Sequence, residues 1–334
     1  MKCRFLPVVL ALTPLLIASS ARARDALYAV SSRGMTAVAV GDSGRILHSP
    51  EAPHKVWLAS TQPFPFAIRA ITTGASDYVA VGDGGKLLRS TDGNGILWQA
   101  RSSRAGGKDL FGVAHVGDRL VAVGDSGVIV RSASQSMDNW SAMEGVPTPK
   151  RLRAVAGETG FTVVVGDSGT ILWSIAGGAI WTAASSVGTH EDLYGVVEGP
   201  GSRFWAVGAA GTVLRSLPNA SDWELLDTGV SGNLHAIACG YTSSGPLVAV
   251  GDGGTILYSN GGLFWSAVDS PTDQNLHGVA YTGGGPGGGF VAVGEENTIL
   301  WSALGVVWEA AVVPVRKTTW GSIRGLWGSS RSSR

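Results

Sequence analysis

A segment of about 42 residues recurs seven times along this chain, and no other feature restricts the fold as strongly. Each copy contains a run similar to Val-Ala-Val-Gly, a short turn usually rich in Asp and Gly, and a second apolar run. The first glycines of the seven turns are Gly41, Gly82, Gly124, Gly166, Gly208, Gly251 and Gly294. A repeat of this period is typical of solenoids and propellers, so the copies have to be interpreted together.

Each copy predicts four short strands. A Leu-x-x-Val-type strand comes first, the Val-Ala-Val-Gly strand second, and the apolar strand after the turn third. A serine follows each repeat glycine by eight residues, at Ser49, Ser90, Ser132, Ser174, Ser216, Ser259 and Ser302. A tryptophan then opens the fourth strand, at Trp57, Trp98, Trp140, Trp181, Trp223, Trp265 and Trp308. Four strands in each of seven units predict an all-β fold, a seven-bladed β-propeller of four-stranded blades.

Radial stacking explains the composition of the second strand. A single blade has two apolar faces that only neighbouring blades can bury, so the strand is apolar at consecutive positions instead of alternating. We expect the turn glycines to supply positive φ and the turn Asp to cap backbone N–H groups. Because the turn recurs in near-identical form, Ser43 is interpreted as turn chemistry and not as a catalytic nucleophile.

The two ends of the chain differ from the repeats. Residues 1–23 have a basic start, a short apolar run and a small-x-small cleavage site, which predicts a signal peptide and an exported protein, periplasmic or secreted. Residues 24–314, the predicted propeller, carry eight more acidic than basic side chains, whereas residues 315–334 form a basic tail with five basic side chains and no acidic one. An acidic body argues against a nucleic-acid partner. Cys239 is the one cysteine after the predicted signal, so we expect no internal disulfide, and we expect a monomer without a transmembrane segment.

The predicted unit boundaries follow the repeat. The units cover about residues 26–66, 67–108, 109–150, 151–191, 192–232, 233–274 and 275–314.

The junction between the third and fourth strands resembles the BNR, or Asp-box, propellers. Residues 90–98, Ser-Thr-Asp-Gly-Asn-Gly-Ile-Leu-Trp, match that turn with one extra residue, while residues 174–181 keep its spacing with Ala in place of the Asp. The whole unit, Val-Ala-Val-Gly-Asp-x-Gly-x-Ile-x-x-Ser…Trp, is similar to the photosystem II assembly and stability factor family. That resemblance covers about residues 25–314 and implies a non-enzymatic scaffold that holds a protein partner during assembly.

One column of residues varies between units where the blade-building residues do not. It is the second position of each first strand, which in a propeller lies near the channel, and we name it the mouth ring: Tyr28, Arg69, Phe111, Arg153, Tyr194, His235 and His277. Arginine, aromatic and histidine side chains together suit an acidic or polar partner. The alternative is that they only fill the channel neck. The residue before each first strand forms a second variable column that includes Asp109, Arg151, Asp192, Asn233 and Asn275.

The sequence also bears on two other kinds of site, a metal site and a glycosidase site. His235 and His277 occupy equivalent positions in adjacent units, but no third ligand is apparent, so no metal site or cofactor is predicted. A sialidase-like glycosidase or carbohydrate-binding protein is the alternative function, with Arg69, Arg153, Tyr194, Glu191 and Asp192 as candidate residues. Those enzymes need three arginines, and only two lie in the mouth ring. No Arg-Ile-Pro start motif precedes the repeats.

Overall fold

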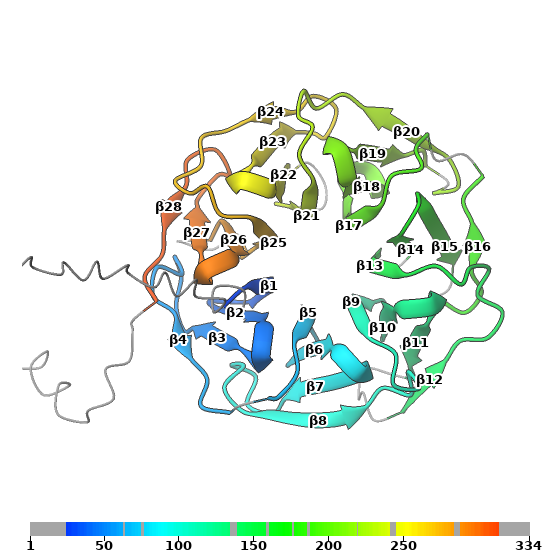
Figure 1. The fold of residues 1–334 in the computed structure, drawn as a ribbon, viewed down its shortest axis with the longest axis horizontal. Helices are drawn as coiled ribbons and strands as arrows, with labels where there is room; N and C mark the ends of the chain where they lie inside the picture. Colours follow the sequence, from blue (N-terminus) through cyan, green and yellow to red (C-terminus); the bar gives the residue numbers. More distant parts are fainter. Residues whose placement is uncertain are drawn as a thin grey trace, which may run out of the picture.

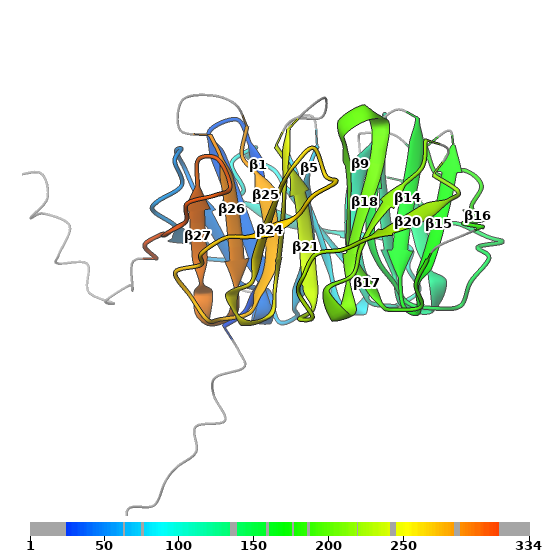
Figure 2. The same ribbon diagram turned by 90° about the horizontal axis from the view of Figure 1, so that it is seen from above.

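Seven four-stranded antiparallel blades form a closed ring around a central channel, which confirms the predicted all-β propeller (Figure 1). The computed structural model describes residues 25–313 except 63, 75–76, 134–138, 158–159, 176, 186–187, 219, 241–244 and 284–287. The predicted signal peptide and the basic tail lie outside the described residues. Seen from the side, the blades form a flat disc whose strands run from one face to the other (Figure 2).

Each blade is built from consecutive strands, with the first strand innermost and the fourth at the rim (Figure 1). Blades 1 to 4 contain β1 (Leu27–Arg33), β2 (Thr36–Gly41), β3 (Ile46–Ser49) and β4 (Leu58–Ala59); β5 (Ile68–Thr73), β6 (Tyr78–Gly82), β7 (Lys86–Ser90) and β8 (Trp98–Ser102); β9 (Leu110–Val116), β10 (Arg119–Gly124), β11 (Ile129–Ser132) and β12 (Trp140–Ala142); β13 (Leu152–Gly157), β14 (Phe161–Gly166), β15 (Thr170–Ile175) and β16 (Thr182–Ala183). Blades 5 to 7 contain β17 (Leu193–Gly199), β18 (Arg203–Gly208), β19 (Val213–Ser216) and β20 (Trp223–Leu226); β21 (Leu234–Cys239), β22 (Pro246–Gly251), β23 (Ile256–Asn260) and β24 (Ser266–Ala267); β25 (Leu276–Tyr281), β26 (Phe290–Gly294), β27 (Ile299–Ser302) and β28 (Glu309–Ala310).

The hydrophobic core lies between blades, as stacking of two-sided strands requires. The cluster between blades 2 and 3 joins Val79 and Leu87 to Leu110 and Leu120, and comparable clusters occupy the other seams. Six of the seven repeat tryptophans are at least 93% buried, and Trp265 is partly exposed. The fourth strand begins one residue after the tryptophan in four blades, so the prediction that it opens that strand holds for β8, β12 and β20.

Close backbone approach explains the repeat glycine. At Gly124, a Cβ atom would lie 1.9 Å from the carbonyl oxygen of Asp109, and in the other six blades the equivalent distance is 2.0–2.1 Å. The same carbonyl accepts a hydrogen bond of 3.0 Å from the amide of Asp125, directly after that glycine. The positive φ expected of the turn falls on the third and fourth turn residues, for example Ser126 (φ 54°) and Gly127 (φ 69°).

The ring closes at the rim between blades 7 and 1. Val56 and Val312 form a parallel bridge, the amide of Trp57 donates to the carbonyl of Val312 at 3.1 Å, and the amide of Val312 donates to the carbonyl of Lys55 at 2.8 Å. We name residues 54–57 with 311–313 the closing clasp. Because blade 7 is complete without a strand from the other end of the chain, the clasp supplements side-chain packing between β1 and β25–β26.

Candidate binding site at the channel mouth

All seven residues of the mouth ring line one cavity at one end of the channel. The cavity has a volume of about 530 Å³, and each blade contributes three consecutive residues of its innermost strand. Below the mouth ring, the fourth position of each strand adds valine or isoleucine, namely Val30, Ile71, Val113, Val155, Val196, Ile237 and Val279. The site is therefore a polar and aromatic ring above an apolar collar.

A β-bulge directs each ring residue into the channel. In blade 1, Leu27 pairs with Gly41 and Ala29 with Val40, so Tyr28 is left out of the ladder. The same irregularity skips the ring residue in the other six blades. A bulged residue is unpaired and the strand bends there, which changes the direction of its side chain. The sequence carries no separate signal for this bulge, because it depends on the register between two strands.

In five of the seven blades, the turn acid holds the ring residue of its own blade. The hydroxyl of Tyr28 donates to Asp42 at 2.7 Å. Likewise Arg69 Nε donates to Asp83 at 2.7 Å. The other same-blade pairs are Arg153 with Asp167 at 2.5 Å, His235 with Asp252 at 2.6 Å and His277 with Glu295 at 3.8 Å. The sequence predicts that these acids cap backbone N–H groups. Asp252 does so, because it accepts a bond of 3.2 Å from the amide of Asn233, but the contact shared by all five acids is with the ring residue, which they orient.

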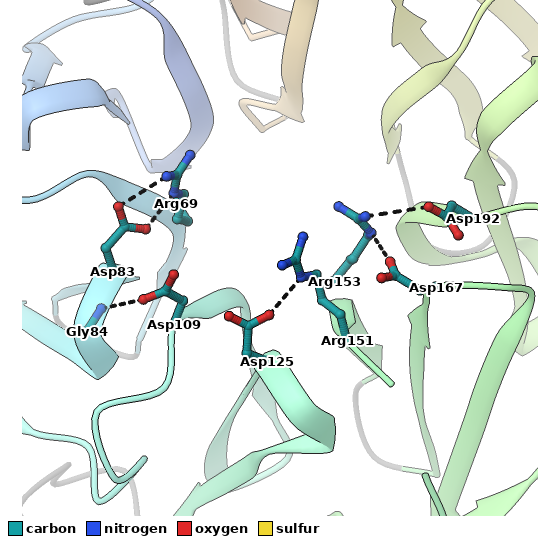
Figure 3. Close-up of polar contacts among 9 residues, drawn as sticks. All are labelled: Arg69, Asp83, Gly84, Asp109, Asp125, Arg151, Arg153, Asp167 and Asp192. Atoms are coloured by element: carbon teal, nitrogen blue, oxygen red, sulfur yellow. Dashed lines mark hydrogen bonds and ion pairs between the residues drawn. The ribbon is translucent and has the colours of Figure 1, made fainter. Parts of the chain in front are cut away.

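Blade 3 departs from this pattern in a way that adds a third arginine to the site. Phe111 cannot form a hydrogen bond, and Asp125 instead accepts one of 2.7 Å from Nε of Arg151, which comes from blade 4 (Figure 3). The Arg151 guanidinium lies over the Phe111 ring at 4.9 Å. Arg151 is not among the residues that line the cavity, but its guanidinium lies beside the mouth ring because it reaches Asp125 and Phe111 of the preceding blade.

Figure 3 shows how the carboxylates hold the three guanidiniums of Arg69, Arg151 and Arg153. Each arginine is held through its Nε edge, and Arg153 has a second contact of 3.6 Å with Asp192. A guanidinium has five N–H donors, so terminal donors remain beyond these contacts. The ion pairs reduce the net positive charge of the mouth while they fix the direction of the remaining donors.

Blade 5 departs in the opposite way, because Ala209 replaces the turn acid. Tyr194 therefore has no carboxylate from its own turn and is held by ring contacts. The Arg153 guanidinium lies 4.9 Å from its centroid, and His235 stacks on it at 5.6 Å.

The second variable column, the residue before each first strand, fastens neighbouring blades together. The carboxylate of Asp109 accepts a bond of 2.6 Å from the amide of Gly84 in the preceding blade. Three others make the equivalent contact: Asp192 to Ser168, Asn233 to Ala210 and Asn275 to Gly253, at 2.8–3.2 Å. Among the candidate glycosidase residues, Asp192 is thus engaged twice, and Glu191 is exposed in the preceding loop.

Ring contacts link six members of the site across six blades. The Arg69 guanidinium lies 4.8 Å from the Tyr28 centroid, and Tyr28 contacts His277 at 5.8 Å. His277 contacts His235 at 5.3 Å, and the chain continues through Tyr194 to Arg153. The mouth therefore has an arginine arc in blades 2 to 4 and an aromatic–imidazole arc in blades 5 to 7 and 1.

Burial and these contacts change the acidity of the site. Burial, with the hydrogen bond to Asp42, raises the pKa of Tyr28 to about 12. Burial lowers the pKa of Arg69, but the bond to Asp83 outweighs it and the net shift is upward. For Asp252, burial alone would raise the pKa, and the hydrogen bond from His235 turns the net shift downward. Arg69 and Asp252 therefore stay charged near neutral pH.

Among the described residues, no group of three or more His, Cys, Asp or Glu side chains is arranged to hold a metal ion. The same part of the chain contains no helix of the length and hydrophobicity needed to cross a membrane.

Solved structures with this fold include two of the same protein. "YCF48 bound to D1 peptide" has a TM-score of 0.66 and 18% identity, over 82% of this chain and 92% of that chain. YCF48 from Cyanidioschyzon merolae has a TM-score of 0.64 and 17% identity, over 83% and 94%. The U3-55K structure has a TM-score of 0.63 at 8% identity, over 81% and 89%. No protein-family model matches the chain, and no curated protein matches its sequence. The Asp-box assignment stays a prediction, and the chain is a seven-bladed propeller that resembles YCF48 in fold.

Proposed function

We propose that this protein is an exported, non-enzymatic scaffold whose mouth ring binds a segment of a protein partner. The observation that carries the proposal is the oriented ring: seven side chains of four types are bulged into one cavity, and most are held by a carboxylate from a repeated turn. A repeated structural device that supports a non-repeated set of side chains is what a specific recognition surface requires.

The arginine arc supports an acidic or polar segment as the bound element. Guanidinium groups with free terminal donors bind carboxylates through paired hydrogen bonds. A propeller of similar shape has been seen with a peptide, YCF48 with a D1 peptide. A role in assembly, similar to that of photosystem II assembly factors, and export to the periplasm or medium are parts of the same proposal.

Site-specific cross-linking tests the position of the partner. The photoreactive analogue p-benzoylphenylalanine would replace Phe111 in the mouth or, as the control, Phe264, which is 87% exposed at the rim. After expression in the source cell and irradiation, we expect a cross-linked species with Phe111 replaced and not with Phe264 replaced. Cross-links only from Phe264 would refute a binding site at the mouth.

Charge reversal tests the contribution of the arginines. In a pull-down, Arg69→Glu/Arg153→Glu should abolish recovery of the protein partner. The control Arg101→Glu/Arg104→Glu changes two exposed positions in and after β8 and should leave that recovery unchanged. Since the first pair also faces Asp83 and Asp167, the milder Arg69→Gln/Arg153→Gln variant checks that loss of recovery does not come from unfolding. Unchanged recovery with both mouth variants would refute the arginine arc as the contact.

A glycosidase is the second candidate, because Arg151 places a third guanidinium beside Arg69 and Arg153 at the edge of the mouth ring. Turnover of a fluorogenic sialoside or glycoside panel tests it. If wild type hydrolyses one of these substrates and Tyr194→Phe does not, the glycosidase function would replace the scaffold proposal.

A further inference from the structure

Two histidines occupy neighbouring bulges in the aromatic–imidazole arc. His235 on β21 and His277 on β25 have ring centroids 5.3 Å apart, at an angle of 58°. Their side chains are 22% and 21% exposed, so both are partly withdrawn from water while they face the cavity.

Titratable groups face the pair from every neighbouring element. Beside His235 lie Asp252 of the turn η7 (Asp252–Gly254) at 2.6 Å and the stacked ring of Tyr194 on β17. Beside His277 lie Glu295 of η8 (Glu295–Asn297) at 3.8 Å and Tyr28 on β1, with the charge of Asp42 of η2 (Asp42–Gly44) acting from behind Tyr28. Arg69 lies against Tyr28 and Arg153 lies against Tyr194, so one tyrosine ring separates each arginine from the histidine pair.

The two imidazoles are not equivalent. His235 forms a hydrogen bond of 2.6 Å with Asp252, whereas His277 lies 3.8 Å from its own turn acid, Glu295. For His277, burial and then the charge of His235 lower the pKa, and Glu295, Asp252 and Asp42 oppose that shift only in part. Groups that interact in this way take up protons in coupled steps that belong to the pair.

We infer that this histidine pair makes the channel mouth proton-responsive, so that an acidic segment is held more tightly under mildly acidic conditions than at neutral pH. Between neutral and mildly acidic pH, arginine side chains keep their charge. Over the same pH range, the two histidines of the aromatic–imidazole arc gain up to two positive charges on the wall of the same cavity. This inference rests on the proposed function for the identity of the bound segment, and the titration of the pair is independent of any partner.

Histidine titration by NMR tests the coupling without a partner. The full chain with ¹³C-labelled histidine would be titrated from pH 8 to 5 as wild type, His235→Gln and the control His190→Gln, an exposed histidine outside the ring. Loss of the neighbouring charge should raise the pKa of His277 by about half a unit or more in His235→Gln and leave it unchanged in His190→Gln. An unchanged pKa of His277 in His235→Gln would overturn the inference.

Binding of a rhodamine-labelled hexaglutamate peptide, measured at pH 8 and pH 5.5, tests the consequence. Wild type should bind about 3- to 10-fold more tightly at pH 5.5, since one or two charges are added within a few ångströms of the peptide. His235→Gln/His277→Gln should lose that difference, and near-UV circular dichroism at pH 5.5 verifies that both proteins stay folded. Equal affinity of wild type at both pH values overturns this inference and leaves the proposed function standing. Absence of binding at both pH values overturns the acidic partner itself, and the inference with it.

Discussion

We expect His54, in the closing clasp, to make the stability of the protein dependent on pH. Its side chain is fully buried, and neither ring nitrogen has a hydrogen-bond partner. Burial lowers the pKa of His54 from 6.5 to about 4. Its carbonyl accepts the indole N–H of Trp57 at 2.8 Å, so the residue lies in the structure that joins blade 1 to blade 7.

The sign and size of the effect follow from linkage. Because the folded-state pKa lies below the unfolded-state value, the unfolded chain binds the proton more readily between pH 6.5 and 4. The contribution of neutral His54 is therefore fully present above pH 6.5 and is lost progressively as the pH falls toward 4. A shift of this size corresponds to about 3 kcal/mol of unfolding free energy at pH 4.

Urea unfolding followed by tryptophan fluorescence measures this loss. Wild type and His54→Asn would be compared at pH 7.5, 6.5, 5.5 and 4.5, since Asn tolerates the left-handed backbone at this position, where φ is 59°. The variant loses packing at every pH, so the informative quantity is the change in unfolding free energy with pH. We expect a steeper decline for wild type, and identical declines would refute the assignment of acid sensitivity to His54.

Three further predictions concern the blades and the mouth. Gly124→Ala should lower the unfolding free energy by about 3 kcal/mol or more, because the new Cβ would overlap a backbone carbonyl. The control Gly160→Ala, which has open space around the Cβ, should change it by less than about 0.5 kcal/mol. Urea unfolding compares the two variants. Trp57→Ala should cost about 3–5 kcal/mol in the same assay, since this side chain is fully buried in the seam that the clasp covers, and a loss below 1 kcal/mol would contradict that packing. In a spectrophotometric titration, one tyrosine should ionise only near pH 12 and return toward pH 10 in Asp42→Asn, and that transition should vanish in Tyr28→Phe.

Much of the fold could be predicted because its determinants are local and repeated. The apolar second strand, the turn glycine and the tryptophan each recur with a period of 41–43 residues, and stacking is the arrangement that buries two-sided strands. The membership of the mouth ring followed from the same register, since equivalent positions of equivalent strands have equivalent surroundings. The structure places all seven predicted residues around one cavity, and binding by that cavity stays a prediction.

The contacts within the mouth could not be predicted in the same way. The turn acid follows its ring residue by 14 to 18 positions, and nothing in that spacing indicates an ion pair. Arg151 belongs to the second variable column, directly before β13, and its contact with Asp125 could not be predicted for a related reason. Asp125 in blade 3 bonds to Arg151 of blade 4 and not to Phe111 of its own blade. Only the packing of these two blades brings Arg151 and Asp125 together.

The sequence by itself determined the architecture, because a seven-fold repeat of two-sided strands can bury its apolar surface only by closing into a ring. It also determined which positions differ from blade to blade and therefore where a specific surface can lie. The tertiary structure decided how those positions act. The bulge that turns each ring residue inward, the carboxylate that orients it and the contact between His235 and His277 all arise from register and from the packing of adjacent blades. Such contacts join residues that are distant in sequence, so they exist only once the ring has closed.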